Sequence, residues 1–186
     1  NIDRRKFIGK TAAAGLAVAG AAVVLNSCKK ELSNEALGLP PILRGAPKGK
    51  KLRAGLVGTG ARGTGAAINF ISAGPDLEII ALADVFQDKI DACRARFASF
   101  NLPIPEENCF AGFDGYKKLM ALPDVDVVIL ATPPQFRPDH FLEAVKTNKH
   151  VFMEKPVAVD PVGIRSVITS AKKAEAIGLN VVTGTQ

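Results

Sequence analysis

The chain has 186 residues, 47% of them apolar, which is long enough for one domain with a sizeable core. Half of its net charge of +6 lies in the first 27 positions, where Arg4, Arg5, Lys6 and Lys10 face one acid, Asp3. The excess in the remainder is small, and no run of aromatic residues interleaved with arginine accompanies it, which argues against a nucleic-acid partner.

Residues 1–27 have the pattern of an export signal. Arg4 and Arg5 precede the apolar pair Phe7 and Ile8, and residues 11–25 carry no charge. This is a charged region followed by an apolar one that is shorter than the roughly 20 residues of a membrane-spanning helix. The segment resembles a twin-arginine signal, which predicts export to the periplasm or to a membrane-anchored state.

The residues at the end of this segment, Leu25-Asn26-Ser27-Cys28, resemble a lipoprotein cleavage box, with Cys28 as the lipid acceptor. A plain cleavage site that contains a cysteine is the alternative. Residues 28–51 have no periodicity and several basic side chains, which predicts a tether, either solvated or touching anionic lipids. We therefore expect membrane contact only through a lipid at Cys28.

From Leu52 onward, short apolar runs alternate with helical patterns. Strands are predicted at Leu52–Val57, Leu77–Ala83, Cys109 and Phe110, Val125–Ala131, His150–Met153 and Leu179–Thr183. Helices are predicted at Gly60–Ser72, Gln87–Phe100, Tyr116–Ala121, Pro138–Thr147 and from the cap Asp160-Pro161 to Ala176, closed by Gly178. Residues 101–108 are expected to form a loop. This alternation predicts an α/β, doubly wound, parallel-sheet Rossmann domain of about six strands over residues 52–186.

Two expectations concern the interior of this domain. The run at 125–131 is the most β-branched of the chain, which predicts a central strand buried on both faces. One stripe of the helix at 87–100 carries Ile90, Cys93, Phe97 and Phe100, and both Cys93 and Cys109 are expected to be small buried hydrophobes. No His or Cys cluster has the spacing of metal ligands, so no metal site is predicted.

The run Gly58-Thr59-Gly60-Ala61-Arg62-Gly63 follows the first predicted strand and opens a helix. In this context the first glycine permits a tight turn, the second lets the backbone approach a pyrophosphate, and the third lets helix and strand pack closely. The helix N-terminus then faces the phosphates. A phosphate-hydrolysing loop is excluded, because Thr64 stands where such a loop needs lysine.

Asp84 ends the second predicted strand, 21 residues after Gly63. An acid at this position can bond both ribose hydroxyls, which favours NAD over NADP. Arg62 leaves an alternative open, since a nearby arginine can also receive a 2′-phosphate, a pyrophosphate or only solvent.

Two further motifs follow strands four and five, at the edge where ligands lie in doubly wound sheets. Thr132-Pro133-Pro134 and Glu154-Lys155-Pro156 are therefore candidate cofactor contacts. Lys155 can polarise or protonate a substrate oxygen as hydride leaves its carbon, if burial or a neighbouring cation favours its neutral form; otherwise it is a surface ammonium. His140, on the next helix after Thr132, is either a further cofactor contact or a structural histidine.

The glycine loop, the LADV run with Asp84, ATPPQFRPDH and MEKP together resemble the Gfo/Idh/MocA oxidoreductase family, from about Leu52 to Gln186. The resemblance implies that Lys155 is catalytic and that its bond to Pro156 is cis. It also implies that Glu154 and Thr132 line the nucleotide, with Gln186 near the nicotinamide. A second α/β domain, which binds substrate and mediates homo-oligomerisation, is expected of such proteins and is absent from these residues.

The leading hypothesis is an exported NAD-dependent oxidoreductase acting on a sugar, polyol or related small molecule, with this chain as its nucleotide-binding half. Because an exported enzyme meets no evident pool of free NAD, the nucleotide is expected to stay bound. One alternative is a glycosidase that oxidises and re-reduces the sugar with bound NAD; the branch of the family that does so tends not to keep the lysine of Glu-Lys-Pro. The other is a non-catalytic nucleotide-binding protein.

Overall fold

The computed structural model describes residue 49 and residues 51–184. The predicted export signal, Cys28, most of the tether and Gln186 lie outside these residues. Within the described part, no helix has the length and apolar character needed to cross a bilayer, and no group of three or more His, Cys, Asp or Glu side chains is placed to hold a metal ion.

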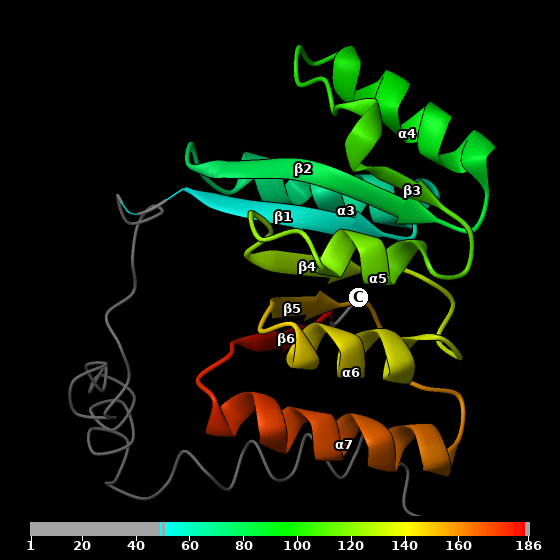
Figure 1. The fold of residues 1–186 in the computed structure, drawn as a ribbon, viewed down its shortest axis with the longest axis vertical. Helices are drawn as coiled ribbons and strands as arrows, with labels where there is room; N and C mark the ends of the chain where they lie inside the picture. Colours follow the sequence, from blue (N-terminus) through cyan, green and yellow to red (C-terminus); the bar gives the residue numbers. More distant parts are fainter. Residues whose placement is uncertain (1–48, 50, 185–186) are drawn as a thin grey trace, which may run out of the picture. The chain divides into compact units, whose positions relative to one another are not determined.

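Strands and helices alternate along the described chain (Figure 1). The strands are β1 (Leu52–Val57), β2 (Leu77–Asp84), β3 (Cys109–Ala111), β4 (Val127–Leu130), β5 (His150–Met153) and β6 (Val181–Thr183). The helices are α3 (Ala61–Ser72), α4 (Gln87–Ala98), α5 (Gly115–Met120), α6 (Arg137–Lys146) and α7 (Pro161–Ala176), with a short 3₁₀ turn, η1, at Glu106–Asn108.

All paired strands run parallel, in the order β3-β2-β1-β4-β5-β6. The chain therefore starts in the middle of the sheet, builds outward to β3, and returns to build the other half from β4. This is the doubly wound α/β fold that the alternating pattern predicts, and it puts the switch point between β1 and β4.

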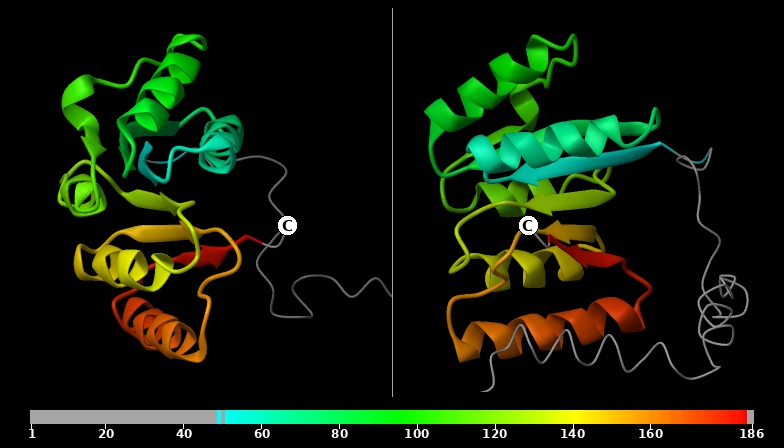
Figure 2. Two further views of the ribbon diagram at one scale, coloured as in Figure 1. Left: turned by 90° about the vertical axis from the view of Figure 1, so that its right-hand side faces the viewer. Right: turned by 180° about the vertical axis from the view of Figure 1, so that it is seen from behind.

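Two apolar clusters hold the layers together. On one face, α3 and α4 pack on the sheet through Ala66, Ala67, Ile90, Cys93 and Phe97. The other cluster joins the strands to α5, α6 and α7, and its helical members are Leu119, Met120, Phe141, Ala144, Val145 and Ala174. Figure 2 shows the two sets of helices on opposite sides of the strands.

The central strand is β4, whose residues 128–130 are fully buried, as predicted, although the regular pairing spans only Val127–Leu130. Helix α7 begins as predicted: the Asp160 carboxylate accepts a hydrogen bond of 2.6 Å from the Gly163 N–H. Gly178, at φ +75°, ends it in the left-handed conformation that glycine tolerates.

Several predicted boundaries of helices and strands were wrong, and so was the predicted burial of Phe100 and Cys109. Helix α4 ends at Ala98, so Phe100 leaves the buried stripe; it is 42% exposed, with the Arg96 guanidinium over its ring. The segment predicted as a loop contains η1 at its end. Cys93 is buried as expected, but Cys109 is only half-buried because β3 is the edge strand of the sheet. Neither of these cysteines forms a disulfide.

Candidate nucleotide site

The glycine run forms the turn between β1 and α3. Gly58 has φ +93°, and a Cβ there would lie 2.7 Å from the Thr132 backbone nitrogen. A Cβ on Gly63 would come within 1.8 Å of the Gly58 carbonyl oxygen, so only glycine lets α3 pack this closely on the strand end. Both glycines thus serve the packing of the turn.

Gly60 differs from the other two. It precedes α3 in an extended conformation, and a Cβ there would meet no atom within 4 Å. No side chain caps the helix, whose first residues, Ala61 and Arg62, are exposed. The turn therefore presents open space beside uncapped backbone N–H groups, which is the arrangement that binds phosphates at helix N-termini.

Asp84, at the end of β2, holds this turn in place. Its Oδ2 accepts hydrogen bonds from the Thr59 N–H at 2.7 Å and the Thr59 hydroxyl at 3.2 Å. Its Oδ1 accepts one from the Phe86 N–H at 3.1 Å. Because an ionised carboxylate offers about four acceptor positions, roughly one remains, on Oδ1, for a ligand.

A cleft of about 390 Å³ opens beside Asp84, bounded by the ends of β1, β2 and β4. The aromatic side chains of Phe86, Phe113, Tyr116 and Phe136 line it. Its charged lining residues are all acidic: Asp84, Asp114 and Asp139, with no Lys or Arg among the lining residues that the structure describes. The cleft suits a flat, largely apolar ligand without an added negative charge.

Thr132, Pro133 and His140 form the β4 side of this cleft. A hydrogen bond of 3.1 Å joins the Thr132 hydroxyl to His140 Nδ1, and the Tyr116 ring lies 4.2 Å from the imidazole. Burial lowers the pKa of His140 to about 4, although the Asp139 carboxylate opposes the shift. His140 is therefore neutral at physiological pH, and it supports Thr132 rather than supplying a cation.

Arg62 and Glu154 meet on the other side of the glycine turn. The Arg62 Nη2 lies 2.5 Å from Glu154 Oε1, across 92 residues of sequence. The Glu154 side chain is 3% exposed and that of Arg62 is 46% exposed. Arg62 is thus directed toward the end of β5 and away from Asp84. This argues against the alternative that Arg62 receives a 2′-phosphate.

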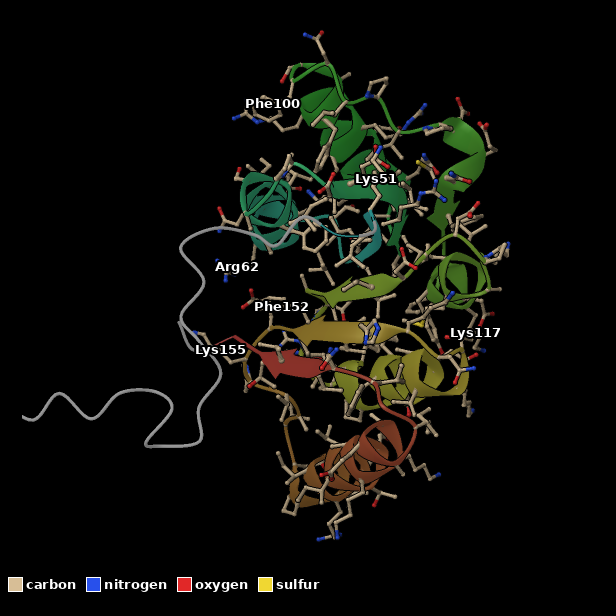
Figure 3. The ribbon with its side chains drawn as sticks, turned by 90° about the vertical axis from the view of Figure 1, so that its left-hand side faces the viewer. Lys51, Arg62, Phe100, Lys117, Phe152 and Lys155 are labelled. Atoms are coloured by element: carbon tan, nitrogen blue, oxygen red, sulfur yellow. The ribbon has the colours of Figure 1, made fainter. Side chains whose placement is uncertain are left out.

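Lys155 follows Glu154 and is exposed, and its peptide bond to Pro156 is cis, as the family resemblance implies. Figure 3 shows the Lys155 and Arg62 side chains projecting on the same side of the molecule. Both residues follow the carboxyl ends of strands, β5 for Lys155 and β1 for Arg62. In the described residues Lys155 is not enclosed, so the burial considered in the sequence analysis is not provided by this part of the chain.

The structure thus arranges the predicted residues in three adjoining places. Asp84, Thr132, Pro133 and His140 border the cleft, the glycine turn lies beside them, and Glu154 and Lys155 follow β5 with Arg62. Gln186 is outside the described residues.

Two groups of residues were missed by the sequence analysis. The first is the aromatic lining of the cleft, which comes from the segments that follow β2, β3 and β4 and has no spacing signal. The second is Arg137, which is 5% exposed although it begins α6. The sequence feature that could have drawn attention to Arg137 is its place directly before a proline in ATPPQFRPDH.

Comparison with known proteins also indicates an NAD-binding Rossmann domain. A family model described as "Oxidoreductase family, NAD-binding Rossmann fold" (GFO_IDH_MocA) matches residues 52–182. A curated protein of Shewanella sp. (strain W3-18-1), named "Glycosyl hydrolase family 109 protein", is 30% identical over 182 residues, which cover 94% of this chain and 38% of that protein. The chain therefore spans well under half the length of this relative.

Solved structures share the fold. Scyllo-inositol dehydrogenase from Lactobacillus casei, with bound NAD(H) and scyllo-inositol, has a TM-score of 0.58 at 24% identity, over 73% of this chain and 36% of that one. The WlbA dehydrogenase from Bordetella pertussis, in complex with NADH and UDP-GlcNAcA, has a TM-score of 0.59 at 22% identity, over 77% and 36%. At these identities the likeness supports the fold alone.

Proposed function

The chain belongs to the Gfo/Idh/MocA oxidoreductase family, of which it carries the NAD-binding Rossmann domain, and from this premise we propose that it is the nucleotide-binding half of an NAD-dependent oxidoreductase acting on a sugar, polyol or related small molecule. The observation that carries the proposal is the open glycine turn at Gly60, flanked by an aromatic cleft on one side and by Lys155 on the other.

The parts of a dinucleotide fit these places in order. The pyrophosphate would lie at Gly60 and the start of α3, where the backbone leaves room and the helix dipole favours negative charge. The adenosine would occupy the aromatic cleft, with one ribose hydroxyl donating to the remaining acceptor position of Asp84. The nicotinamide would then extend toward the end of β5 and Lys155.

Three features favour NAD over NADP. The cleft carries three carboxylates that would repel a 2′-phosphate, and no Lys or Arg among its described lining residues would neutralise one. Arg62, the arginine of the glycine turn, pairs with Glu154 on the side of the turn away from the cleft. Removing it from that pair would leave a buried carboxylate without its closest cation, which is costly.

Lys155 is the proposed catalytic residue. A bound nicotinamide supplies the acceptor or donor of a hydride. The ammonium or amine of Lys155 would hydrogen-bond the substrate oxygen and give or take its proton as the hydride moves at the attached carbon. Replacing Lys155 by Ala is expected to abolish turnover and to spare NAD binding.

A glycosidase that uses bound NAD is the second candidate, because curated relatives are named as members of glycosyl hydrolase family 109. Lys155 favours the dehydrogenase, since the glycosidase branch tends not to keep this lysine. Assay of the full-length protein with sugars and polyols in the presence of NAD, and separately with aryl glycosides, distinguishes the two. Release of the aryl alcohol without net reduction of NAD would favour the glycosidase.

We further propose export by the twin-arginine route, supported by the Arg4-Arg5 pattern, with Cys28 as a lipid acceptor and NAD carried out already bound. Cell fractionation tests the route: the double variant Arg4→Lys, Arg5→Lys should remain in the cytoplasm, and Cys28→Ser should lose membrane attachment. Ready loss of NAD from natively exported protein on dialysis would contradict cofactor retention.

Nucleotide binding is tested by one matched pair of substitutions. Gly60→Ala adds a methyl group where the pyrophosphate would lie, and Gly65→Ala adds one on α3; neither Cβ meets an atom within 4 Å. We expect Gly60→Ala to weaken NAD binding by roughly tenfold or more in a calorimetric titration, because backbone approach to the phosphates is lost. Equal affinity in the two variants would refute the proposed placement.

A further inference from the structure

Arg137 makes three hydrogen bonds to backbone carbonyls from a single buried guanidinium. Its Nε donates to the Thr132 carbonyl at 2.8 Å, and its Nη1 donates to the Glu154 carbonyl at 2.5 Å and to the Pro156 carbonyl. The residue is only 5% exposed. Its hydrogen bonds are therefore made inside the protein, where the low dielectric constant makes them electrostatically stronger than in water.

These carbonyls belong to two different loops. Thr132 follows β4 and borders the aromatic cleft, whereas Glu154 and Pro156 flank Lys155 at the end of β5. The planar guanidinium has several donors in a fixed geometry, so one side chain can hold both loops at a defined separation. A lysine ammonium has no such fork and would hold fewer of these carbonyls in the same geometry.

We propose that Arg137 is a positioning residue that fixes Lys155 relative to the bound dinucleotide by joining the loops after β4 and β5. The inference rests on the proposed function, since it assumes that NAD spans from the cleft to Lys155. Arg137 acts through the backbone on either side of Lys155, which carries the proposed chemistry. It also keeps the Glu154 backbone in place for the pair between Glu154 and Arg62.

A purely structural role for Arg137 is the alternative, and the chain offers a matched control. Lys149 is a second buried cation, 7% exposed, whose ammonium donates to the Leu122 carbonyl at 2.8 Å. It lies just before β5, at the opposite edge of the sheet from Lys155. Loss of Lys149 removes a buried cation–carbonyl bond without touching the loops of the proposed site.

The test compares Arg137→Gln, Arg137→Lys and Lys149→Gln with wild-type protein of the same length. Dissociation constants are measured for AMP, which would occupy the cleft and the start of the glycine turn but not reach the end of β5, and for NAD, which would reach both loops; thermal unfolding is recorded for every variant. We expect Arg137→Gln to weaken NAD binding roughly tenfold and AMP binding less than about threefold, because only NAD needs both loops in register. Arg137→Lys should fall between Arg137→Gln and wild type.

Lys149→Gln should lower the unfolding temperature and leave the ratio of the AMP and NAD dissociation constants at its wild-type value. A wild-type ratio in folded Arg137→Gln, or the same ratio in Arg137→Gln and Lys149→Gln, overturns the positioning role. If Arg137→Gln does not fold, the ratio in Arg137→Lys decides. Failure of the wild-type protein to bind either nucleotide would instead overturn the proposed function, and this inference with it.

Discussion

Protonation of His140 is expected to make the stability of the protein depend on pH well above the range in which carboxylates titrate. Burial lowers the pKa of this imidazole from its ordinary value of 6.5 to about 4 in the folded state. In the unfolded chain it regains the ordinary value. Between these two pH values the unfolded chain binds a proton that the folded protein does not bind.

The direction and size of the effect follow from this difference. Above pH 6.5 both states are neutral and His140 costs nothing; as the pH falls toward 4, the free energy of unfolding decreases by about 1.4 kcal/mol per pH unit. The expected loss is about 2 kcal/mol between pH 6.5 and 5 and about 3 kcal/mol by pH 4.

Urea unfolding at half-unit steps from pH 7.5 to 5 measures this slope, with His140→Gln as the matched variant. Glutamine keeps a polar group that can bond the Thr132 hydroxyl but does not titrate. The slope should largely disappear in that variant. NMR titration of the imidazole provides the independent check: a midpoint near 6.5 for His140 in the folded protein, or an unchanged slope in His140→Gln, would refute the reasoning.

Three further predictions concern stability. Gly63→Ala should unfold the domain or displace α3, since its Cβ would lie 1.8 Å from a backbone oxygen, and circular dichroism and thermal melts measure this. Arg62→Ala should cost about 2 kcal/mol in urea unfolding and Glu154→Gln less, because Arg62 is half exposed and its loss strands a buried carboxylate; equal costs would contradict this order. Asp160→Ala should cost about 1 kcal/mol through loss of its cap on α7, and Asp160→Asn, which keeps an acceptor, should restore most of it in the same assay.

The succession of strands and helices along the chain was predictable because the apolar runs, and the Gly, Pro and Asp residues between them, are local signals. Each predicted apolar run from Leu52 onward forms a strand. Helix α7 begins after its cap Asp160 and ends before Gly178, as predicted. The errors fall where tertiary contacts decide the outcome. Phe100 lies on the periodic stripe of the sequence, but α4 ends before it, so its ring is not buried against the sheet. Cys109 is on an edge strand, which sequence periodicity does not identify.

The site was predictable only where one short segment contains the signal. The glycine turn and the acid after β2 have a fixed spacing, and the motifs after β4 and β5 fall at one edge because the strands are parallel. Interactions between distant segments were not predictable. No spacing rule could indicate that Asp84 would bond the Thr59 N–H, or that Arg62 would reach Glu154 and not the cleft.

The two charged residues of the Glu-Lys-Pro segment, Glu154 and Lys155, have different surroundings and different expected roles. Glu154 is buried, its carboxylate pairs with Arg62 from the start of α3, and its carbonyl accepts from Arg137 at the start of α6. One residue after β5 is thereby tied to both halves of the doubly wound sheet, across the switch point where a dinucleotide would lie. Lys155 is exposed beside it. Substitutions of Glu154 should therefore appear first in stability and in NAD affinity, whereas substitutions of Lys155 should appear in turnover alone.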